Sequence, residues 1–525
     1  MKKKSENILL PSPLLFLVAF VEGFLIMGVE LTGAKIAAPF YGTSFFVWTT
    51  IIGITLSCLS IGYYVGGRLT IKYSSPVSLV VLLLLSGLFI FIMPFTGKWL
   101  LTQVIDLPIL TGVVLGVTGY LLLPLSLLGM LSPGLINLLA KNGISAGKSS
   151  GKIYAISTFA GIVSAILYGF WLLPSWGIIL NIFLFSTAVL ILAAFLSFKL
   201  KAKYFATVAV LATIVFFMLF MSNRKKSLQH PDLNVKTVYQ SEGLLGQIKV
   251  MDNIDGQSRT LYVNNSSQTR SHITGRSLFP YVYRISTFVS HKPPGSSVLL
   301  AGLGGGNLVY ELDMFKFNIE VVELDQRIKE VAKKYFAMPS NVPIVINDAR
   351  YFIKTTTKKY DVIILDLSAG ETMPSNVYTK EAFIEMRKLL KPEGIIVLHF
   401  ISNTSEEGLI SVLSIGKTFE EAGYNVDLLN TSPSPENTSP FIFIASLHNI
   451  DYESLNFTID PDLPSQLIPD KQNLLMNLAF DKGFLLTDDK PFLDVIHRPI
   501  VMDLRRDNIE QIVKPLSKGG VKMFK

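Results

Sequence analysis

Long apolar runs fill about the first 220 residues of the chain, whereas the remainder alternates between short apolar runs and polar segments. A helix needs about 20 apolar residues to cross a hydrocarbon core of roughly 30 Å. Seven stretches reach this length, namely residues 13–33, 45–66, 77–96, 109–130, 154–173, 178–197 and 204–222. The pattern therefore predicts a multi-span α-helical membrane bundle of about seven helices over residues 1–225.

The stretch from Ile109 to Leu139 leaves the number of spans open. Pro124 and Pro133 lie inside it, and proline interrupts the hydrogen bonding of a helix. The stretch can form one span followed by a re-entrant piece, or two short spans, so six or eight spans are alternatives to seven. The first span is too long for a removable signal peptide and lacks a small-residue cleavage site. We expect it to stay as an anchor.

The composition agrees with a chain that lies largely in lipid. Of the 525 residues, 50% are apolar and only 16% are charged, and the mean hydropathy is +0.45. These values are too apolar for an ordinary soluble chain of this length. The single cysteine, Cys58, lies inside a predicted span, which excludes a disulfide or a cysteine-based metal site within one chain.

Basic residues in the short loops indicate an orientation, because Lys and Arg are retained on the cytosolic side. Only Lys35 and Lys98 fall on the side away from the N-terminus. The basic residues on the N-terminal side are Lys2, Lys3, Lys4, Arg68, Lys72, Lys141, Lys148, Lys152, Lys199, Lys201 and Lys203. The N-terminus should therefore be cytosolic, and an odd number of spans then places the second half outside the cytosol. We interpret the net charge of +8 as contact with lipid headgroups rather than nucleic-acid binding.

Two carboxylates, Glu22 and Glu30, lie in the first predicted span. A carboxylate inside a membrane is costly, so each is a candidate for proton coupling or for holding a cationic substrate. The alternative is that they lie near the ends of the span or bond to neighbouring helices. The sequence leaves both interpretations open.

From about Gln240 the pattern changes to strands. Residues 246–263 have the pattern of β-hairpins around a turn-rich segment, which predicts a small β-rich part over residues 226–290. Beyond it, short apolar runs alternate with helix-length segments, as is typical of buried parallel strands in a doubly wound sheet. These runs are 298–300, 319–322, 344–346, 362–365 and 395–398, with a late strand expected at 441–444. An α/β Rossmann-like domain is therefore expected over residues 291–525.

Glycines and carboxylates follow the ends of successive predicted strands, where ligands bind in such sheets. They are Gly302, Gly304 and Gly306 after the first strand, Glu323 at the end of the second, Asp348 after the third and Asp366 at the end of the fourth. Glycine lets the backbone turn tightly and approach a ligand, and a carboxylate after the second strand can accept hydrogen bonds from ribose hydroxyls. Turn glycines and helix caps explain any one position but not the whole set. The extra carboxylates favour an adenosyl ligand over a dinucleotide.

With these motifs the chain resembles the polyamine aminopropyltransferases, or spermidine synthases. It resembles more closely their membrane-fused branch, in which a multi-span bundle precedes a spermidine-synthase-like domain. In the bundle the resemblance rests on residues 38–44 and 60–68. In the soluble half it rests on residues 246–248, 302–306, 322–325, 347–349, 361–366, 377–379 and 486–491.

The resemblance implies a Rossmann-like fold of the adenosylmethionine-dependent methyltransferase type. It also implies transfer of an aminopropyl group from decarboxylated S-adenosylmethionine to an amine such as putrescine. Gln247, Glu323 and Asp348 would hold the adenosine, and Ala349 and the glycine loop would complete the cofactor site. Asp366 would be the base that removes a proton from the attacking amine. The resemblance implies no metal and no nucleic-acid partner. A homodimer is a possible assembly that the sequence does not decide.

The implied co-substrate bears on the side of the membrane. Decarboxylated S-adenosylmethionine is made in the cytosol, which favours a cytosolic soluble domain, whereas the loop charges favour an extracytosolic one. We expect a multi-pass protein of the cell membrane, and the sequence leaves this conflict open.

The chain departs from the family pattern around the amine. Where the family's glycine loop carries an Asp that holds the aminopropyl end, this chain has Gly305, and the second family Asp, three residues beyond the base, is Ala369 here. A family His near the substrate mouth aligns with Tyr281, whose ring could face a cation or simply pack. Glu371 is close enough in sequence to replace a lost carboxylate. The alternative, that Glu371 is a solvated acid in a loop, has at least equal weight. A buried ammonium without a partner costs about several kcal/mol, so diamine affinity depends on such a replacement.

Three functions therefore compete. The first is an aminopropyltransferase with altered amine specificity, and the second is a transferase, such as a methyltransferase, that uses ordinary S-adenosylmethionine. The third is a membrane transporter or sensor whose soluble domain binds a nucleoside or polyamine without turnover. Retention of Asp366 favours an enzyme, whereas the missing carboxylates and the intramembrane Glu22 and Glu30 favour the third. We rank the three in the order given.

Overall fold

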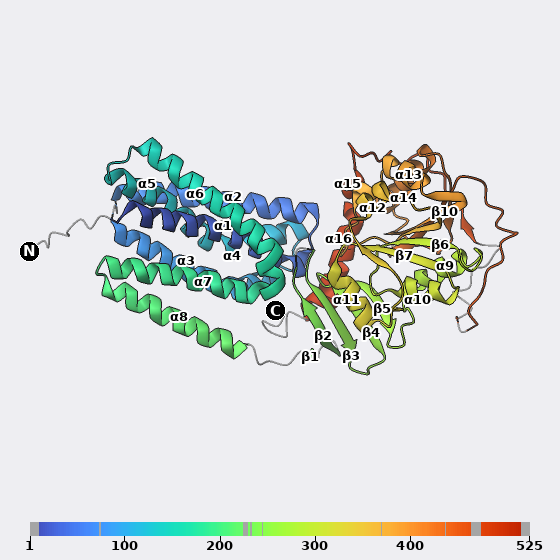
Figure 1. Cartoon of the computed structure of the whole chain (residues 1–525), viewed down its shortest axis with the longest axis horizontal. Coiled ribbons are helices and arrows are strands. Elements are labelled where there is room, and N and C mark those ends of the chain that lie inside the picture. The colour runs from blue at the N-terminus through green and yellow to red at the C-terminus, as the bar shows by residue number, and fades with distance from the viewer. Residues whose placement is uncertain are drawn as a thin grey trace, which may run out of the picture. The chain divides into compact units, whose positions relative to one another are not determined.

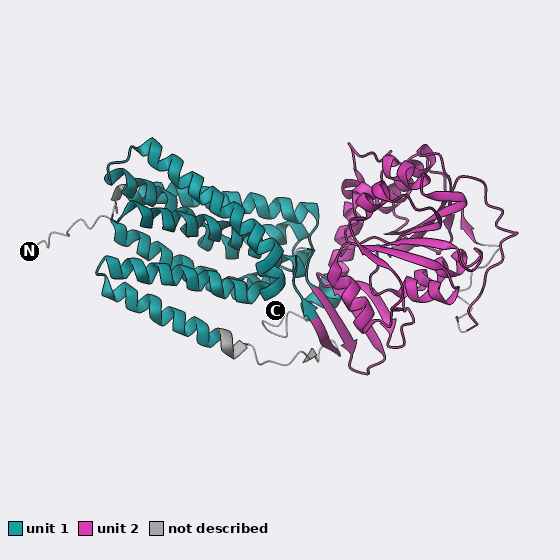
Figure 2. Cartoon of the chain, in the orientation of Figure 1, with its two compact units in different colours: residues 1–233, 240–247, 509–525 teal, residues 234–239, 248–508 magenta. Residues whose placement is uncertain are grey.

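The chain divides into two compact units (Figure 2). The structure is a computed structural model that describes residues 10–72, 75–223, 229–230, 234–243, 245–368, 370–435, 437–461, 463 and 474–515. The helical unit comprises residues 1–233, 240–247 and 509–525, and the α/β unit comprises residues 234–239 and 248–508.

Apolar helices form the helical unit (Figure 1). Proline at the first or second position starts α1, α3 and α7, because that position has no intrahelical partner for an amide. Ser75 caps α3 by accepting a hydrogen bond from the Val77 amide at 3.3 Å. The helices are α1 (Ser12–Tyr41), α2 (Phe45–Lys72), α3 (Pro76–Gln103), α4 (Ile109–Gly129), α5 (Leu131–Lys141), α6 (Ala146–Leu167), α7 (Leu173–Lys199) and α8 (Lys203–Asn223), with a π-helical turn, η1 (Tyr168–Leu172), between α6 and α7.

Among the described residues, five continuous helical stretches are long and apolar enough to cross a membrane, and Lys203–Leu219 is a shorter apolar helix. One of the five, Ile109–Lys141, contains both α4 and α5. The break between them lies at Met130, whereas Pro124 stays inside α4 and Pro133 inside α5. The predicted division of this stretch therefore occurs between the two prolines. With 11 residues, α5 is too short to cross a bilayer by itself.

The stretch Ala146–Lys199 contains a second break. Its 54 residues correspond to about 80 Å of helix, more than twice the thickness of a hydrocarbon core. It bends at Gly177, whose φ of 67° and ψ of −174° are not helical. The Asn181 amide donates to the carbonyl oxygens of Leu172 (2.8 Å) and Gly177 (2.6 Å), which satisfies acceptors that the bend releases. The helix that follows Gly177 is therefore separate from α6, and the number of membrane crossings stays a prediction.

The described residues after the helices form a five-stranded sheet in the order β1-β2-β3-β4-β5, which confirms the predicted small N-terminal sheet. Asn264 and Asn265 make the two-residue turn between β4 and β5, with φ of 51° and 63°. Asn tolerates this left-handed conformation, which hairpin turns of this length require. The strands are β1 (Gln229–His230), β2 (Val235–Ser241), β3 (Ile248–Asn253), β4 (Ser258–Val263) and β5 (Ser266–His272).

An eight-stranded mixed sheet forms the centre of the α/β unit in its described part, in the order β13-β11-β12-β10-β9-β6-β7-β8. The five strands from β10 to β8 in this order are parallel, whereas β12 runs antiparallel to β10 and β11. The predicted Rossmann-like sheet is confirmed, and β11 and β13 extend it. The strands are β6 (Ser297–Ala301), β7 (Asn318–Glu323), β8 (Ile344–Ile346), β9 (Tyr360–Leu365), β10 (Leu390–Ser402), β11 (Asn425–Leu429), β12 (Ser439–Ser446) and β13 (Leu475–Met476).

Both faces of this sheet are buried. On β6, Val298 and Leu300 belong to one hydrophobic core, and Leu299 and Ala301 belong to the other. Helices α9 to α11 contribute to the first core, and α12 to α14 contribute to the second (Figure 1). Because neither face meets water, the central strands are continuous apolar runs in the sequence. The helices are α9 (Pro280–Val289), α10 (Asn307–Met314), α11 (Gln326–Tyr335), α12 (Ala349–Thr355), α13 (Lys380–Arg387), α14 (Glu406–Glu421), α15 (Leu493–Ile496) and α16 (Arg498–Asn508).

The chain returns to the helical unit after α16. The π-helical turn η6 (Ile509–Val513) contributes the buried Ile509 and Val513 to the apolar core of that unit. Lys514 forms ion pairs with Asp106, between α3 and α4, and with Glu510. The helical unit is therefore built from both ends of the chain.

Candidate active site

The predicted site residues gather along one edge of the eight-stranded sheet. The glycine loop follows β6, Glu323 ends β7, Asp348 follows β8 and Asp366 follows β9. These four strands are parallel neighbours in the order β9-β6-β7-β8. Because the carboxyl ends of parallel strands meet at the same edge, the tertiary structure brings together Gly302 and Asp366, which are 64 positions apart in the sequence.

Gly302 allows the loops after β6 and β9 to touch. Its φ is 94°, and a Cβ atom added there would lie 2.1 Å from the carbonyl oxygen of Asp366. No other residue fits this approach without displacing the backbone of the Asp366 loop. Further along the loop, Gly306 occupies the N-cap of α10 in a left-handed conformation, with φ of 85°, so the loop leads directly to the amides of a helix N-terminus.

Gly305 has no room for a side chain. A Cβ atom there would lie 2.7 Å from Cγ2 of Thr269 and 2.9 Å from Cδ1 of Phe336. Its amide donates a hydrogen bond to Oγ1 of Thr269 at 2.7 Å. At the position where the family carries an Asp, the loop therefore packs closely against β5 and the end of α11.

Glu323 presents a carboxylate that the backbone holds in place. Its Oε2 accepts from the Leu303 amide (3.0 Å) and its Oε1 from the Asp325 amide (2.8 Å). Burial raises the pKa of Glu323, and the hydrogen bonds from Asp325 and Leu303 oppose that rise. One bond comes from the glycine loop itself, so the carboxylate is tied to the loop that would face a ligand.

Asp348 is the N-cap residue of α12. Its Oδ1 accepts from the Tyr351 amide at 2.9 Å, a capping role that its position before a helix allows. Ala349, the first residue of that helix, is buried in the core shared by α12, α13 and α14. The capping bond uses one Asp348 oxygen, and its proposed contact with adenine stays a prediction.

Asp366 accepts hydrogen bonds from two side chains. The Tyr281 hydroxyl on α9 donates to Oδ2 at 3.1 Å, and Nδ1 of His399 on β10 lies 2.8 Å from Oδ1. The Tyr281 and His399 rings stack, with centroids 3.8 Å apart and planes inclined by 7°. Burial, followed by the neighbouring Asp366 carboxylate, raises the pKa of Tyr281 well above its usual value, so the hydroxyl stays protonated and donates. This carboxylate is therefore oriented from two sides.

The sequence analysis missed His399. It lies in an apolar strand, one residue beyond Leu398, which is in register with Leu365 at the end of β9. This register places His399 beside Asp366. A lone histidine within an apolar run is the only signal that the sequence offers, and its partner becomes evident only when the strands pair.

Strand β5 holds two of the site loops. Thr269 binds the Gly305 amide, as described above, and the adjacent Gln268 donates to the carbonyl oxygen of Gly370 at 3.0 Å and accepts from the Ser368 hydroxyl at 2.7 Å. The small sheet thus fixes the glycine loop and the loop after β9 relative to each other. The sequence analysis had assigned β5 no such role.

Glu371 is held by a buried cation. Its carboxylate lies 2.9 Å from Nη1 of Arg505 on α16, and Asn508 donates to it at 2.9 Å. The side chains of Glu371 and Arg505 are 5% and 2% exposed. Its proposed role as a replacement carboxylate for the amine stays a prediction, and any cationic ligand would have to compete with Arg505.

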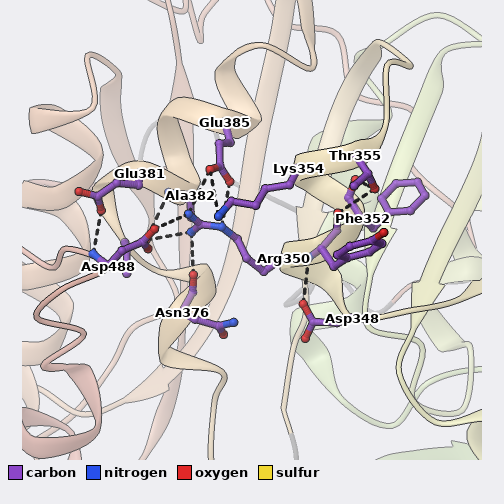
Figure 3. Close-up of polar contacts among 12 residues, drawn as sticks. Asp348, Arg350, Phe352, Lys354, Thr355, Asn376, Glu381, Ala382, Glu385 and Asp488 are labelled. Atoms are coloured by element: carbon purple, nitrogen blue, oxygen red, sulfur yellow. Dashed lines mark hydrogen bonds and ion pairs between the residues drawn. The ribbon is translucent and has the colours of Figure 1, made fainter.

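A second buried arginine, Arg350, organises the loop between β9 and α13 (Figure 3). Its Nη1 donates to the carbonyl oxygen of Asn376 (2.8 Å) and to the Thr379 hydroxyl (3.0 Å), and its Nη2 donates to Asp488 (2.8 Å). Glu385 flanks the guanidinium on another side. The segment 486–491, on which the family resemblance partly rests, therefore has a structural role, because it supplies the Asp488 carboxylate.

Gln247 belongs to the helical unit. Its amide donates to the Glu242 carboxylate, and both side chains are buried. Its proposed contact with the adenosine stays a prediction. Ala369 lies outside the described residues. Among those described, no three His, Cys, Asp or Glu side chains gather as a metal site would require.

Comparisons with known proteins match the α/β unit. Residues 279–449 match the sequence model of the spermine/spermidine synthase domain. The chain is 32% identical over 118 residues to a probable polyamine aminopropyl transferase of Bifidobacterium longum, which covers 22% of this chain and 26% of that protein. It is 32% identical over 136 residues to the polyamine aminopropyltransferase of Vibrio vulnificus, which covers 25% of this chain and 46% of that protein. The chain thus spans less than half the length of these two relatives.

A longer match reaches into the apolar helices. The chain is 25% identical over 441 residues to polyamine aminopropyltransferase 2 of Aquifex aeolicus, which covers 79% of this chain and 84% of that protein. Residues 234–525, which contain the α/β unit and everything after it, make up less than the 79% of the chain that this match covers. The similarity therefore includes part of the helical unit.

Proposed function

We propose that the chain, whose residues 279–449 match the sequence model of the spermine/spermidine synthase domain, transfers an aminopropyl group from decarboxylated S-adenosylmethionine to an amine. The amine nitrogen attacks the carbon next to the sulfonium, the carbon–sulfur bond breaks, and methylthioadenosine leaves. The amine's proton passes to Asp366. Such a displacement depends mainly on positioning and on charge complementarity.

The observation that carries this proposal is the orientation of Asp366. Its carboxylate is held by Tyr281 and His399 at the same sheet edge as Glu323 and the glycine loop. In this assignment Asp366 is the base, and His399 and Tyr281 are positioning residues that fix its carboxylate. Asp348, Ala349, Gly302, Gly304 and Gly306 would line the nucleoside, and the family resemblance assigns Gln247 to the adenosine as well.

The acceptor is proposed to need only one carboxylate. Gly305 has no room for a side chain, and the charge of Glu371 is balanced by Arg505. The described residues therefore provide fewer free carboxylates for the second ammonium group of a diamine than the family pattern does. Tyr281 stacks on His399, which engages one face of its ring. We therefore expect monoamines to serve as acceptors at least as well as the diamine putrescine.

The test is calorimetric binding to the detergent-solubilised full chain. Methylthioadenosine, decarboxylated S-adenosylmethionine and S-adenosylmethionine are titrated, each with and without a monoamine or putrescine. Tight binding of the decarboxylated nucleoside, strengthened by amine, supports the proposal. A preference for S-adenosylmethionine favours methyl transfer instead, and a lack of nucleoside binding overturns both enzymatic functions.

The Asp366→Asn variant tests the base. Removing a general base typically costs about 10²- to 10⁴-fold in rate, so we expect aminopropyl transfer to fall by that much while methylthioadenosine affinity is retained. Asp451→Asn, at an exposed position, is the matched control and should leave the rate unchanged. A fully active Asp366→Asn variant contradicts the mechanism.

We further propose that the protein lies in the cell membrane through the helical unit, with lipid around its apolar helices. Five described stretches have the length and composition for this. Membrane association would be checked by carbonate extraction of membranes that contain the chain. The resemblance also leaves a homodimer possible. The mass of the detergent-solubilised protein would show whether one forms.

A further inference from the structure

A buried carboxyl group lies inside the helical unit, far along the sequence from the proposed active site. Glu22, on α1, is 1% exposed, and its neighbours Val18, Ala19 and Leu25 on the same helix are equally buried. The residue falls within the apolar stretch Ser12–Tyr41. Nothing in the proposed transfer reaction uses it. An ionised carboxylate without a cation at such a place costs far more than a neutral one.

One oxygen of this carboxyl group has a partner and the other does not. The Ser132 hydroxyl, on α5, donates to Oε1 at 2.7 Å, and Ser132 is itself 2% exposed. Ser132 is the second residue of α5, where helix amides lack intrahelical acceptors. Oε2 is buried and has no hydrogen-bond partner among the described residues.

The ionisable groups on neighbouring helices do not neutralise Glu22. Helices α2 to α7 all contact α1, and none of the ion pairs made by described residues includes Glu22. Lys152 on α6 lies over the Phe16 ring at 5.8 Å. Tyr63 on α2 interacts with Glu22 and with Tyr154 on α6, and a neutral phenol cannot offset a carboxylate charge.

The residue after Glu22 lies where α1 and α6 are in close contact. The next residue, Gly23, lies against α6 so closely that a Cβ atom would be 2.0 Å from the carbonyl oxygen of Ser157. Backbone meets backbone at this crossing of α1 and α6. In a bundle packed this closely, a proton adds no volume, unlike a hydrated metal ion or an organic ammonium.

We propose that Glu22 is a reversible proton-binding site in the helical unit. In the packed arrangement the group is a carboxylic acid, with Oε1 accepting from Ser132 and the proton on Oε2. Loss of the proton to water leaves a carboxylate between α1 and α5. Because that charge is costly while buried and stable when hydrated, deprotonation favours separation of α5 from α1. The site thereby couples proton concentration to helix packing.

Infrared spectroscopy of the full chain in lipid vesicles tests this inference directly. A protonated carboxylic acid gives a carbonyl band that a carboxylate and a glutamine lack. We expect the wild-type protein to show this band, Glu22→Gln to lose it, and the matched variant Glu30→Gln, at a less buried position on the same helix, to retain it. Raising the pH should abolish the band reversibly.

A second variant keeps the test valid if Glu22→Gln fails to fold. Ser132→Ala retains the acid but removes its hydrogen bond, so the carbonyl band should shift to higher frequency without loss of intensity. The inference is overturned if Glu22→Gln, folded as judged by circular dichroism, leaves the acid band unchanged. It is also overturned if the band does not respond to pH, which would make Glu22 a fixed structural group. Neither outcome depends on aminopropyl transfer.

Discussion

At the residue scale, the orientation of Asp366 depends on two side-chain donors. Tyr281 and His399 each bind one oxygen of the carboxylate, and their stacked rings hold each other in place. Each oxygen then retains a lone pair that can accept a further hydrogen bond. The orientation of the carboxylate is set before an amine arrives, which avoids a cost of reorganisation during the reaction.

His399 provides a prediction about this orientation. His399→Phe keeps an aromatic ring for stacking on Tyr281 but removes the donor, and a hydrogen bond to a charged group contributes about 1.5–3 kcal/mol. We expect the turnover number to fall by about 10- to 100-fold, with little change in KM. His399→Gln retains a donor and should recover most of the rate. Steady-state kinetics of both variants check this, and equal losses in the two would show that His399 only packs.

Glu311 makes the stability of the α/β unit depend on pH. Burial raises the pKa of Glu311 from 4.5 to about 7, although the Arg276 guanidinium, 3.7 Å away, opposes the rise. The folded chain therefore binds more protons at this group than the unfolded chain between these values. Its contribution is most favourable below about pH 4.5 and is lost as the pH rises through about 7.

We accordingly expect the thermal unfolding midpoint of the α/β unit to fall as the pH rises through that range. In Glu311→Gln the fall should be smaller, because the amide does not ionise. Scanning calorimetry of both proteins at a series of pH values measures the difference. Parallel profiles for the two proteins would rule out Glu311 as its source.

At the element scale, the Arg350 network joins parts of the chain that are distant in the sequence. The guanidinium on α12 binds the turn before α13, Glu385 on α13 and Asp488 near the C-terminus (Figure 3). Thr379, the N-cap of α13, also donates to Asp488 at 2.6 Å. These contacts fix the start of α13 and so close the loop that leaves β9.

Removing Arg350 should therefore destabilise the α/β unit strongly. Arg350→Met removes the buried guanidinium from Asp488 and leaves Glu385 with Lys354, 3.8 Å away, and breaking a buried pair costs about 3–5 kcal/mol. The exposed pair Lys380–Glu421 (3.4 Å) provides the control, because Lys380→Met should change stability by about 1 kcal/mol or less. Denaturant unfolding of the two variants measures both values. A small effect of Arg350→Met would show that water replaces the guanidinium.

At the scale of the whole molecule, α8 belongs to the helical bundle. Phe216 on α8 stacks on Phe91 of α3, with ring centroids 3.6 Å apart, and packs in one cluster with Leu190 of α7. Helices α6, α7 and α8 then form three consecutive members of the bundle. If each crosses the membrane, the loop before α6 and the α/β unit lie on opposite sides.

Cysteine labelling tests this arrangement. In a Cys58→Ser background, which removes the single cysteine, Ser145→Cys and Asp255→Cys place a thiol at exposed positions before α6 and in the β3–β4 turn. We expect a membrane-impermeant maleimide to label only one of the two on intact cells. Because the proposed co-substrate is made in the cytosol, Ser145→Cys should be the labelled variant. Labelling of Asp255→Cys instead would agree with the loop charges and oppose cytosolic supply of the nucleoside. Equal labelling of both would contradict three crossings.

Much of the architecture could be predicted because it depends on local patterns. The central strands β6 to β9 are apolar on both faces, and their positions agree with the predicted runs. Strands β11 and β13 were missed because Asn425–Leu429 carries polar residues and Leu475–Met476 is very short. Apolar length likewise predicted the helices, but the breaks at Met130 and Gly177 are set by how neighbouring helices pack.

The sequence by itself determined the two kinds of architecture and the carboxylates that follow successive strands, because hydrophobic periodicity and strand ends are local properties. Only the tertiary structure decided which groups those carboxylates meet. His399 reaches Asp366 through strand register, Arg505 reaches Glu371 from α16, and Ser132 reaches Glu22 through the crossing of two helices. Each pairing joins residues that are tens of positions or more apart, and a charge or hydrogen bond acts only over a few ångströms once folding has brought its partners together.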